Sequence, residues 1–146
     1  MAQFQSILLV GCGNMAGAML EGWLAAGRNP AGFTIVDPVR VEAPGGLEIR
    51  RNLRASGAFD AILLGVKPQS PGAVAPQLAP LASAGTTMLS LLAGVELAVL
   101  AERFPAAGAH VRVMPNLGVA LGKAPVALVE RGLDEAGRAA LLALMA

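Results

Sequence analysis

A short apolar run followed at once by a glycine-rich turn and a helical pattern is the feature that most constrains the fold of this chain. Ile7 to Val10 has the length and composition of a buried strand. The run passes into Gly11-Cys12-Gly13-Asn14-Met15-Ala16, and apolar residues recur at helical spacing from about Asn14 to Ala26. Gly27 is expected to end that helix. A strand, a tight turn and a helix in this order are typical of a parallel α/β sheet.

Strand-length apolar runs alternate with helical segments along the rest of the chain. Such runs are typical of parallel strands that are buried on both faces. The stretch Val39 to Ile49 contains Pro44-Gly45-Gly46 and is too broken for a full crossover helix. We therefore predict one doubly wound α/β domain over residues 1–146, with a mainly parallel sheet. Further strands are predicted at Phe33 to Asp37, Ala61 to Val66, Thr86 to Leu92, His110 to Met114 and Pro125 to Val129, and further helices at Ala73 to Ala82, Glu96 to Phe104 and from Asp134 onward.

The composition argues against several classes of function. The 11 basic and 10 acidic residues leave a net charge of +1, which is not the basic surface of a nucleic-acid-binding protein. One cysteine and one histidine exclude a disulfide framework and the usual cysteine-rich zinc sites. Pro68 to Val95 is uncharged and long enough to span a bilayer, but prolines and glycines divide it into short elements. We expect no nucleic acid, no metal and no membrane segment, and a cytoplasmic location.

The glycine-rich turn has a direct chemical interpretation. Gly11 permits a tight exit from the strand, Gly13 lets the backbone approach a pyrophosphate, and Ala16 allows the helix to pack closely on the strand. The amino end of the following helix then offers free N–H groups to the phosphates. The alternative is a tight turn with no ligand. Because an apolar strand precedes the turn and an acid follows the second predicted strand, we expect NADP(H) or NAD(H) to bind, as in Rossmann-type domains.

The residues after the second predicted strand bear on which dinucleotide binds. Asp37 is placed to accept hydrogen bonds from the adenosine ribose hydroxyls, which favours NAD. Arg40 is placed to hold a 2′-phosphate, which favours NADP. Asp37-Pro38 is also a common way to open a turn, so the choice stays open.

Three further motifs follow predicted strands, at the sheet edge where open parallel sheets bind ligands. They are Lys67-Pro68, Leu92-Ala93-Gly94 and Met114-Pro115-Asn116. Two other residues were considered as catalytic groups and are not favoured. Cys12 is expected to be a small residue of the turn rather than a nucleophile, and His110 a surface or supporting residue rather than a base.

Taken in order, four segments resemble pyrroline-5-carboxylate reductases. They are Gly11 to Met15, Val66-Lys67-Pro68-Gln69, Ser90 to Val95 and Arg112 to Asn116. The resemblance covers nearly the whole chain, but only the N-terminal, cofactor-binding part of that family. It implies reduction of 1-pyrroline-5-carboxylate to L-proline with NAD(P)H, and a homo-oligomer for the full-length form. In the family, a helical C-terminal part absent here supplies the dimer interface and most of the substrate pocket.

The resemblance also implies site residues. No catalytic acid or base is implied, and Lys67 and Asn116 are candidates for positioning the reacting rings. Asp37-Pro38 and the broken stretch after it depart from the family, which has residues suited to a 2′-phosphate there. The implied cofactor residues are Gly11, Cys12, Gly13, Asn14, Met15, Ala16, Asn52, Gly65, Val66, Lys67, Pro68, Leu92, Ala93, Gly94 and Asn116. Asp37, Pro38 and Arg40 are added because they follow the second predicted strand, where the adenosine ribose is expected.

Two other functions remain open. One is a related hydroxyacid-type dehydrogenase built on the same front domain, and the other is a non-catalytic NAD(P)-binding module. The last predicted helix runs to Ala146 without a cap, so the chain is expected to be the front part of a longer protein, with little or no turnover by itself.

Overall fold

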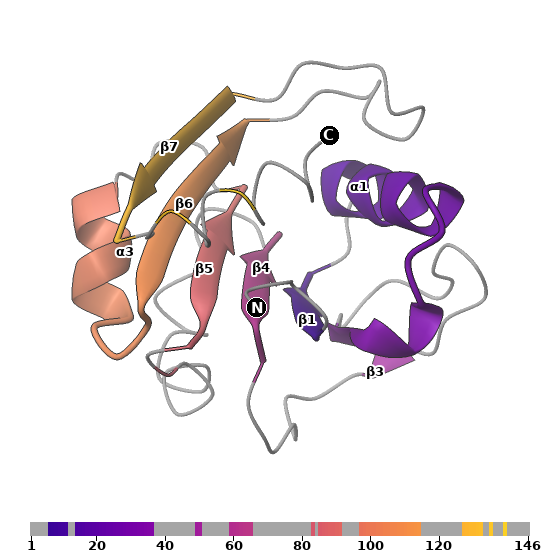
Figure 1. Cartoon of the computed structure of the whole chain (residues 1–146), viewed down its shortest axis with the longest axis horizontal. Coiled ribbons are helices and arrows are strands. Elements are labelled where there is room, and N and C mark those ends of the chain that lie inside the picture. Colours follow the sequence, from indigo (N-terminus) through magenta and orange to yellow (C-terminus); the bar gives the residue numbers. More distant parts are fainter. Residues whose placement is uncertain are drawn as a thin grey trace.

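The computed structural model describes residues 6–11, 14–36, 49–50, 59–65, 83, 85–91, 97–114, 127–132, 135 and 139. Within these residues seven strands form one sheet, and helices pack on both of its faces (Figure 1). The helical elements are α1 (Asn14–Ala25), the short 3-10 helix η1 (Pro30–Gly32) and α3 (Leu97–Arg103). The strands are β1 (Ile7–Val10), β2 (Phe33–Val36), β3 (Ile49–Arg50), β4 (Ala61–Leu64), β5 (Thr87–Ser90), β6 (Ala109–Met114) and β7 (Ala127–Arg131).

The strand order, β3-β2-β1-β4-β5-β6-β7, is that of a doubly wound sheet. From β1 the chain builds outward to β2 and β3, and then returns to the other side of β1 to build β4, β5 and β6. These six strands are parallel, and only β7 runs antiparallel to its neighbour β6. The predicted Rossmann-type α/β fold with a mainly parallel sheet is confirmed.

The core is divided into two layers by the sheet. All four residues of β1 are buried, and successive side chains enter different layers. Leu9 packs in the layer that contains Met19 of α1. Leu8 packs in the other layer with Leu100 of α3. The two helices therefore cover opposite faces, which explains why the β1 sequence is apolar throughout.

Helix α1 ends in the way that the glycine after it predicts. Gly27 has a φ of 92°, and its N–H donates to the carbonyl of Leu24 at 3.1 Å. The N–H of Arg28 donates to the carbonyl of Trp23, also at 3.1 Å. These two bonds form a Schellman motif, which satisfies carbonyls that the end of a helix leaves without partners.

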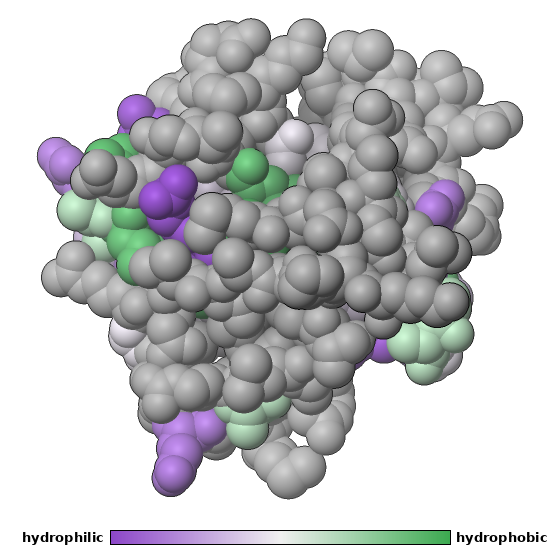
Figure 2. Space-filling model, turned by 90° about the horizontal axis from the view of Figure 1, so that it is seen from above, coloured by the Kyte–Doolittle hydropathy of each residue, from purple (hydrophilic) through white to green (hydrophobic). Residues whose placement is uncertain are grey.

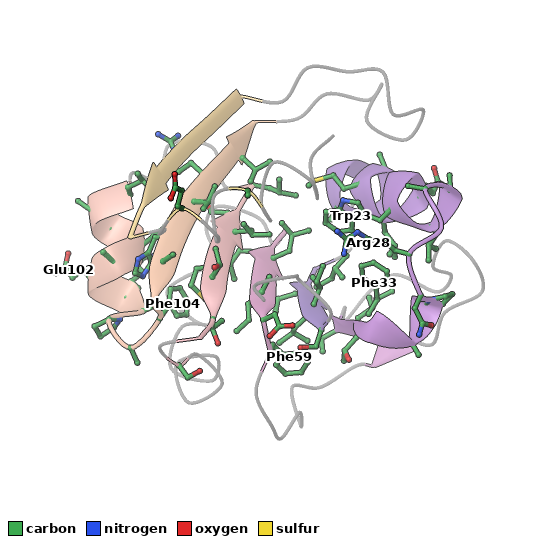
Figure 3. The ribbon with its side chains drawn as sticks, viewed as in Figure 1. Trp23, Arg28, Phe33, Phe59, Glu102 and Phe104 are labelled. Carbon is green, nitrogen blue, oxygen red and sulfur yellow. The ribbon has the colours of Figure 1, made fainter. Side chains whose placement is uncertain are left out.

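An aromatic stack fixes the carboxyl end of α1 against the start of β2. The rings of Trp23 and Phe33 lie 5.7 Å apart with an interplanar angle of 4° (Figure 3). Trp23 is 5% exposed, so the stack belongs to the core layer under α1.

The amino ends of the strands are joined by a polar network. The Asp60 carboxylate accepts from the N–H of Ser6 at 3.2 Å, and the Ser6 hydroxyl accepts from the N–H of Asp60 at 3.0 Å. The Thr86 hydroxyl donates to the carbonyl of Phe59 at 2.8 Å. These bonds satisfy backbone groups where β1, β4 and β5 begin.

Most predicted elements match the structure, with differences at their ends. The strand predicted over Thr86 to Leu92 is shorter, and β3 was not predicted at all. The predicted helix over Ala73 to Ala82 lies outside the described residues, and of the last predicted helix only Glu135 and Ala139 are described, both of them helical. Among the described residues no helix has the length and hydropathy needed to cross a membrane.

The backbone at Gly27 supplies a test of the α1 terminus. We predict that Gly27→Ala lowers the free energy of unfolding by about 1–2 kcal/mol, because a side chain at positive φ is strained. A Cβ there would meet nothing within 4 Å, so the φ alone would be responsible. Gly85→Ala is the matched control, since Gly85 also has open space but no positive φ. Urea denaturation should show Gly85→Ala to be neutral or stabilising by about 0.4–1 kcal/mol; equal effects of the two variants would contradict the prediction.

Candidate functional site

Strands β1 to β5 end level with one another and form one edge of the sheet. Figure 2 shows the molecule from above, with hydrophobic residues of the described part at the surface to the left of its middle. Val10 at the end of β1 is in register with Val36 of β2 and with Leu64 of β4. Leu64 is in turn in register with Ser90 of β5. In open α/β sheets ligands bind beyond this carboxyl edge.

Backbone hydrogen bonds continue one residue past the strands and hold this edge together. The N–H of Gly11 donates to the carbonyl of Val36 at 2.7 Å, and the N–H of Gly65 donates to the carbonyl of Val10 at 2.8 Å. The N–H of Leu91 donates to the carbonyl of Leu64 at 3.0 Å. The turns that follow β1, β4 and β5 therefore all start from fixed backbone positions.

The direction of sheet building reverses between β1 and β4, so a crevice is expected there. Gly11, which follows β1, has a φ of 83°, a conformation that residues with a Cβ rarely adopt. A Cβ placed on Gly65, which follows β4, would lie 2.5 Å from the carbonyl oxygen of Gly11 and 3.1 Å from the Cβ of Ala16. The three small residues Gly11, Ala16 and Gly65 thus meet in one close contact, which we call the three-residue contact.

Helix α1 begins within this contact and directs its amino end to the same edge. Ala16 is 2% exposed, so α1 is packed tightly against the strands in its first turn. That first turn carries no acidic residue, and the first acid of the helix is the exposed Glu21. The positive end of the helix dipole and its free N–H groups are therefore opposed by no negative charge in that turn, which fits the binding of a phosphate group.

The structure brings together some of the sequence-predicted site residues. Gly11 and Ala16 meet Gly65, and Asn14 and Met15 form the start of α1. Strand β2 ends immediately before the predicted site residue Asp37. Strand β5 ends two residues before Leu92, and β6 ends two residues before Asn116. The predicted residues outside the described part are Cys12, Gly13, Asp37, Pro38, Arg40, Asn52, Val66, Lys67, Pro68, Leu92, Ala93, Gly94 and Asn116, and their roles stay predictions.

His110 has a structural role. The side chain is 7% exposed, so the expectation of a surface position is wrong. Its Nε2 lies 2.8 Å from the carbonyl oxygen of Phe104, just past the end of α3. His110 is the second residue of β6 and lies toward the amino edge of the sheet, away from the three-residue contact. No group of three or more His, Cys, Asp or Glu side chains that could hold a metal ion occurs among the described residues.

The contact between Gly65 and the glycine-rich turn is the functional feature that reasoning from single motifs missed. Gly65 entered the predicted site only through the family resemblance, as the residue before Val66-Lys67-Pro68. The sequence does contain a signal, a glycine directly after a fully buried apolar strand. Its meaning depends on β1 and β4 being neighbours, which local sequence does not reveal.

The strand order, the reversal between β1 and β4 and the glycine turn define a nucleotide-binding domain of the Rossmann type. A family model described as "NADP oxidoreductase coenzyme F420-dependent" matches residues 6–94. That match covers more than half of the chain, and the chain belongs to this family.

Individual relatives agree with the resemblance seen in the motifs. Pyrroline-5-carboxylate reductase of Pasteurella multocida is 33% identical over 123 residues, which cover 78% of this chain and 45% of that protein. The Pseudomonas aeruginosa enzyme of the same name is 33% identical over 116 residues, covering 75% of this chain and 42% of that protein. The chain thus spans less than half the length of these two curated relatives.

Solved structures confirm the fold. Pyrroline carboxylate reductase of Plasmodium falciparum with NADP bound matches with a TM-score of 0.82 at 18% identity, over 99% of this chain and 55% of that one. Pyrroline-5-carboxylate reductase of Coxiella burnetii matches with a TM-score of 0.83 at 20% identity, over 98% of this chain and 56% of that one. Prephenate dehydrogenase of A. aeolicus has the same fold, with a TM-score of 0.73 at 14% identity.

Two glycines allow the three-residue contact to be tested against a matched control. A Cβ on Gly65 would lie 2.5 Å from a carbonyl oxygen at the carboxyl edge, and one on Gly132 would lie 2.6 Å from the carbonyl oxygen of Gly108, beside the start of β6. We predict that Gly65→Ala lowers the free energy of unfolding by about 1–3 kcal/mol, because it overpacks backbone. Gly132→Ala should lower it by at least as much, because Gly132 also has a φ of 93°, at which a side chain is strained.

Only Gly65→Ala should also weaken nicotinamide dinucleotide binding, because only its contact displaces the turn beside α1. Urea denaturation gives the stability of both variants, and nicotinamide fluorescence titration of the folded proteins gives the dissociation constants. Equal dissociation constants for the two variants would show that the contact does not shape the site.

Proposed function

We propose that this chain is the NAD(P)H-binding domain of an oxidoreductase that reduces 1-pyrroline-5-carboxylate to L-proline. The observation that carries the proposal is the three-residue contact at the amino end of α1. It lies between β1 and β4, where the order in which strands are added to the sheet reverses. The names of the curated relatives and the NADP bound to the Plasmodium falciparum structure support the choice of substrate and cofactor.

Each part of the carboxyl edge has a proposed task in holding the cofactor. The turn from Gly11 to Ala16 would hold the pyrophosphate, because small residues let the phosphates approach the amino end of α1. Gly65 to Pro68 and Leu92 to Gly94 would line the neighbouring part of the cleft, since they follow β4 and β5. Asn52 completes the cofactor contacts proposed from the family resemblance.

The chemistry requires orientation more than side-chain acid or base groups. When bound, NAD(P)H supplies a hydride to the imine carbon of the substrate, and the imine nitrogen, already protonated, becomes the amine of proline. The task of the chain is to hold the nicotinamide ring and keep water out. Lys67 and Asn116 are the proposed positioning residues at the ends of β4 and β6. Among the described residues that end β1, β2, β4 and β5, none is a histidine or a carboxylate.

The proposal extends to organisation and partners. We assign residues 1–146 to one NAD(P)-binding domain, and the dimerisation and substrate regions to the part of the relatives that this chain does not cover. The partner is a small-molecule substrate, with no nucleic acid and no membrane, in a cytoplasmic homo-oligomer of the full-length form. A hydroxyacid-type dehydrogenase and a non-catalytic NAD(P)-binding module are the alternatives.

Cofactor binding is the first test. Titration of the chain with NADPH and NADH, followed by nicotinamide fluorescence, should show saturable binding of at least one of them at submillimolar concentration. The reason is that the first turn of α1 offers free backbone N–H groups and carries no acid that would repel the pyrophosphate. Absence of binding by either dinucleotide would overturn the proposed function.

Turnover is the second test. The 146-residue chain is expected to bind cofactor yet to oxidise little or no NADPH when 1-pyrroline-5-carboxylate is added, because it spans less than half the length of its curated relatives. Loss of nicotinamide absorbance measures the reaction, and a full-length relative serves as the positive control. Turnover equal to that of the relative would contradict the assignment of the substrate pocket to the part of the relatives that this chain does not cover.

A further inference from the structure

We infer that Arg112 binds the carboxylate of a small acidic substrate beside the cofactor. The inference rests on the proposed function, because it needs a dinucleotide bound at the carboxyl edge. It assigns to this chain one contact of a substrate pocket whose other parts are assigned above to the region of the relatives that this chain does not cover.

Arg112 lies near the carboxyl edge, on the face of the sheet that α3 covers. It is the fourth residue of β6 and is in register with Ser90, the last residue of β5. Its neighbours Val111 and Val113 are buried in the core layer under α1. Because successive side chains of a strand point to opposite faces, Arg112 points to the other face. It stands on the same face as His110, which contacts the end of α3, but two residues nearer the carboxyl edge.

The row of residues in register with Arg112 becomes polar toward β6. Val10 of β1 and Leu64 of β4 are apolar and fully buried. Ser90 of β5 comes next and is 1% exposed. Arg112 follows on β6 and is only partly buried, so its guanidinium is accessible to a ligand. The polar end of the row thus lies on the side of the sheet away from β1 and the glycine-rich turn.

The charge of Arg112 has no partner in the part of the chain that the structure describes. No hydrogen bond or ion pair of its guanidinium is formed there. The residues in register with it, Ser90 and Val129, are uncharged. The acid of α3, Glu102, is exposed in the last turn of that helix, toward the amino edge. The guanidinium therefore offers its planar set of N–H donors to an external anion, and a carboxylate matches that geometry with two parallel hydrogen bonds.

The position of β6 indicates which anion this is. Strand β6 is the third strand from β1 on that side, which is about 14 Å at the usual strand spacing. The pyrophosphate is proposed to bind after β1, and the nicotinamide half of a dinucleotide lies toward β4, β5 and β6. The phosphates are thus too far from Arg112. The anion that meets the nicotinamide is the substrate, and 1-pyrroline-5-carboxylate carries one carboxylate on its ring.

Titrations with a carboxylate and its amide test the inference. The 146-residue chain is saturated with the oxidised dinucleotide that it binds. It is then titrated with L-proline, the product of the proposed reaction, or with L-prolinamide, in which the carboxylate is replaced. The side-chain Nε–H signal of Arg112 is followed by nuclear magnetic resonance and assigned by its loss in Arg112→Lys. We expect a saturable shift with L-proline and none with L-prolinamide.

Two variants separate a local contact from a change in net charge. Arg112→Gln should weaken L-proline binding by about tenfold or more, followed by the backbone N–H signal of Ser90, because hydrogen bonds to a charged group are lost. The dissociation constants for NADH and NADPH should change by no more than about twofold, because the phosphates lie elsewhere. Arg103→Gln is the matched control, since it removes another partly buried arginine, from the last turn of α3. It should leave L-proline binding unchanged.

The outcomes are distinguishable, once thermal denaturation followed by circular dichroism has shown each variant to be folded. An Nε–H signal of Arg112 that L-proline does not move, or that L-prolinamide moves equally, would overturn the inference and leave the proposed cofactor binding intact. Unchanged L-proline binding by Arg112→Gln would do the same. Failure of both dinucleotides to bind would overturn the inference together with the proposed function.

Discussion

The close approach of Gly65 to the carbonyl oxygen of Gly11 is the constraint on which the rest of the site depends. The approach leaves no room for a Cβ on Gly65, and it brings Ala16 of α1 within contact of β4. Because α1 is thereby packed against two strands at its first turn, its amino end is held in a fixed position at the carboxyl edge. Any residue larger than glycine after β4 would have to move the turn after β1.

The two edges of the sheet are built with different chemistry. At the amino edge, side chains of Ser6, Asp60 and Thr86 satisfy the backbone groups where the strands begin. At the carboxyl edge, the described bonds that extend the sheet run from backbone to backbone, at Gly11, Gly65 and Leu91. The hydrogen bonds of Ser6, Asp60 and Thr86 thus lie at the edge opposite to the one assigned to ligand binding.

Much of the fold could be predicted because its strands are short apolar runs buried on both faces, as β1 and β4 show. Strand β3 was missed because it has only two residues and follows a Pro-Gly-Gly segment, so its existence depends on pairing with β2. The orientation of β7 depends on its pairing with β6, which the sequence of β7 alone does not reveal. The burial of His110 depends on a hydrogen-bond partner, the carbonyl of Phe104, which is a backbone group and leaves no mark in the sequence. For the site, Gly11 and Ala16 could be identified from the turn itself, but the contact of Gly65 needed the strand order.

The aromatic stack at the end of α1 gives the chain an intrinsic optical probe. Trp23 is the only tryptophan of the 146 residues, and it is buried on the same helix whose amino end borders the proposed cofactor site. Indole emission overlaps the absorption band of reduced nicotinamide but not that of the oxidised form. Resonance energy transfer from this single donor would therefore report the redox state of a bound cofactor, without a label and without an enzymatic reaction.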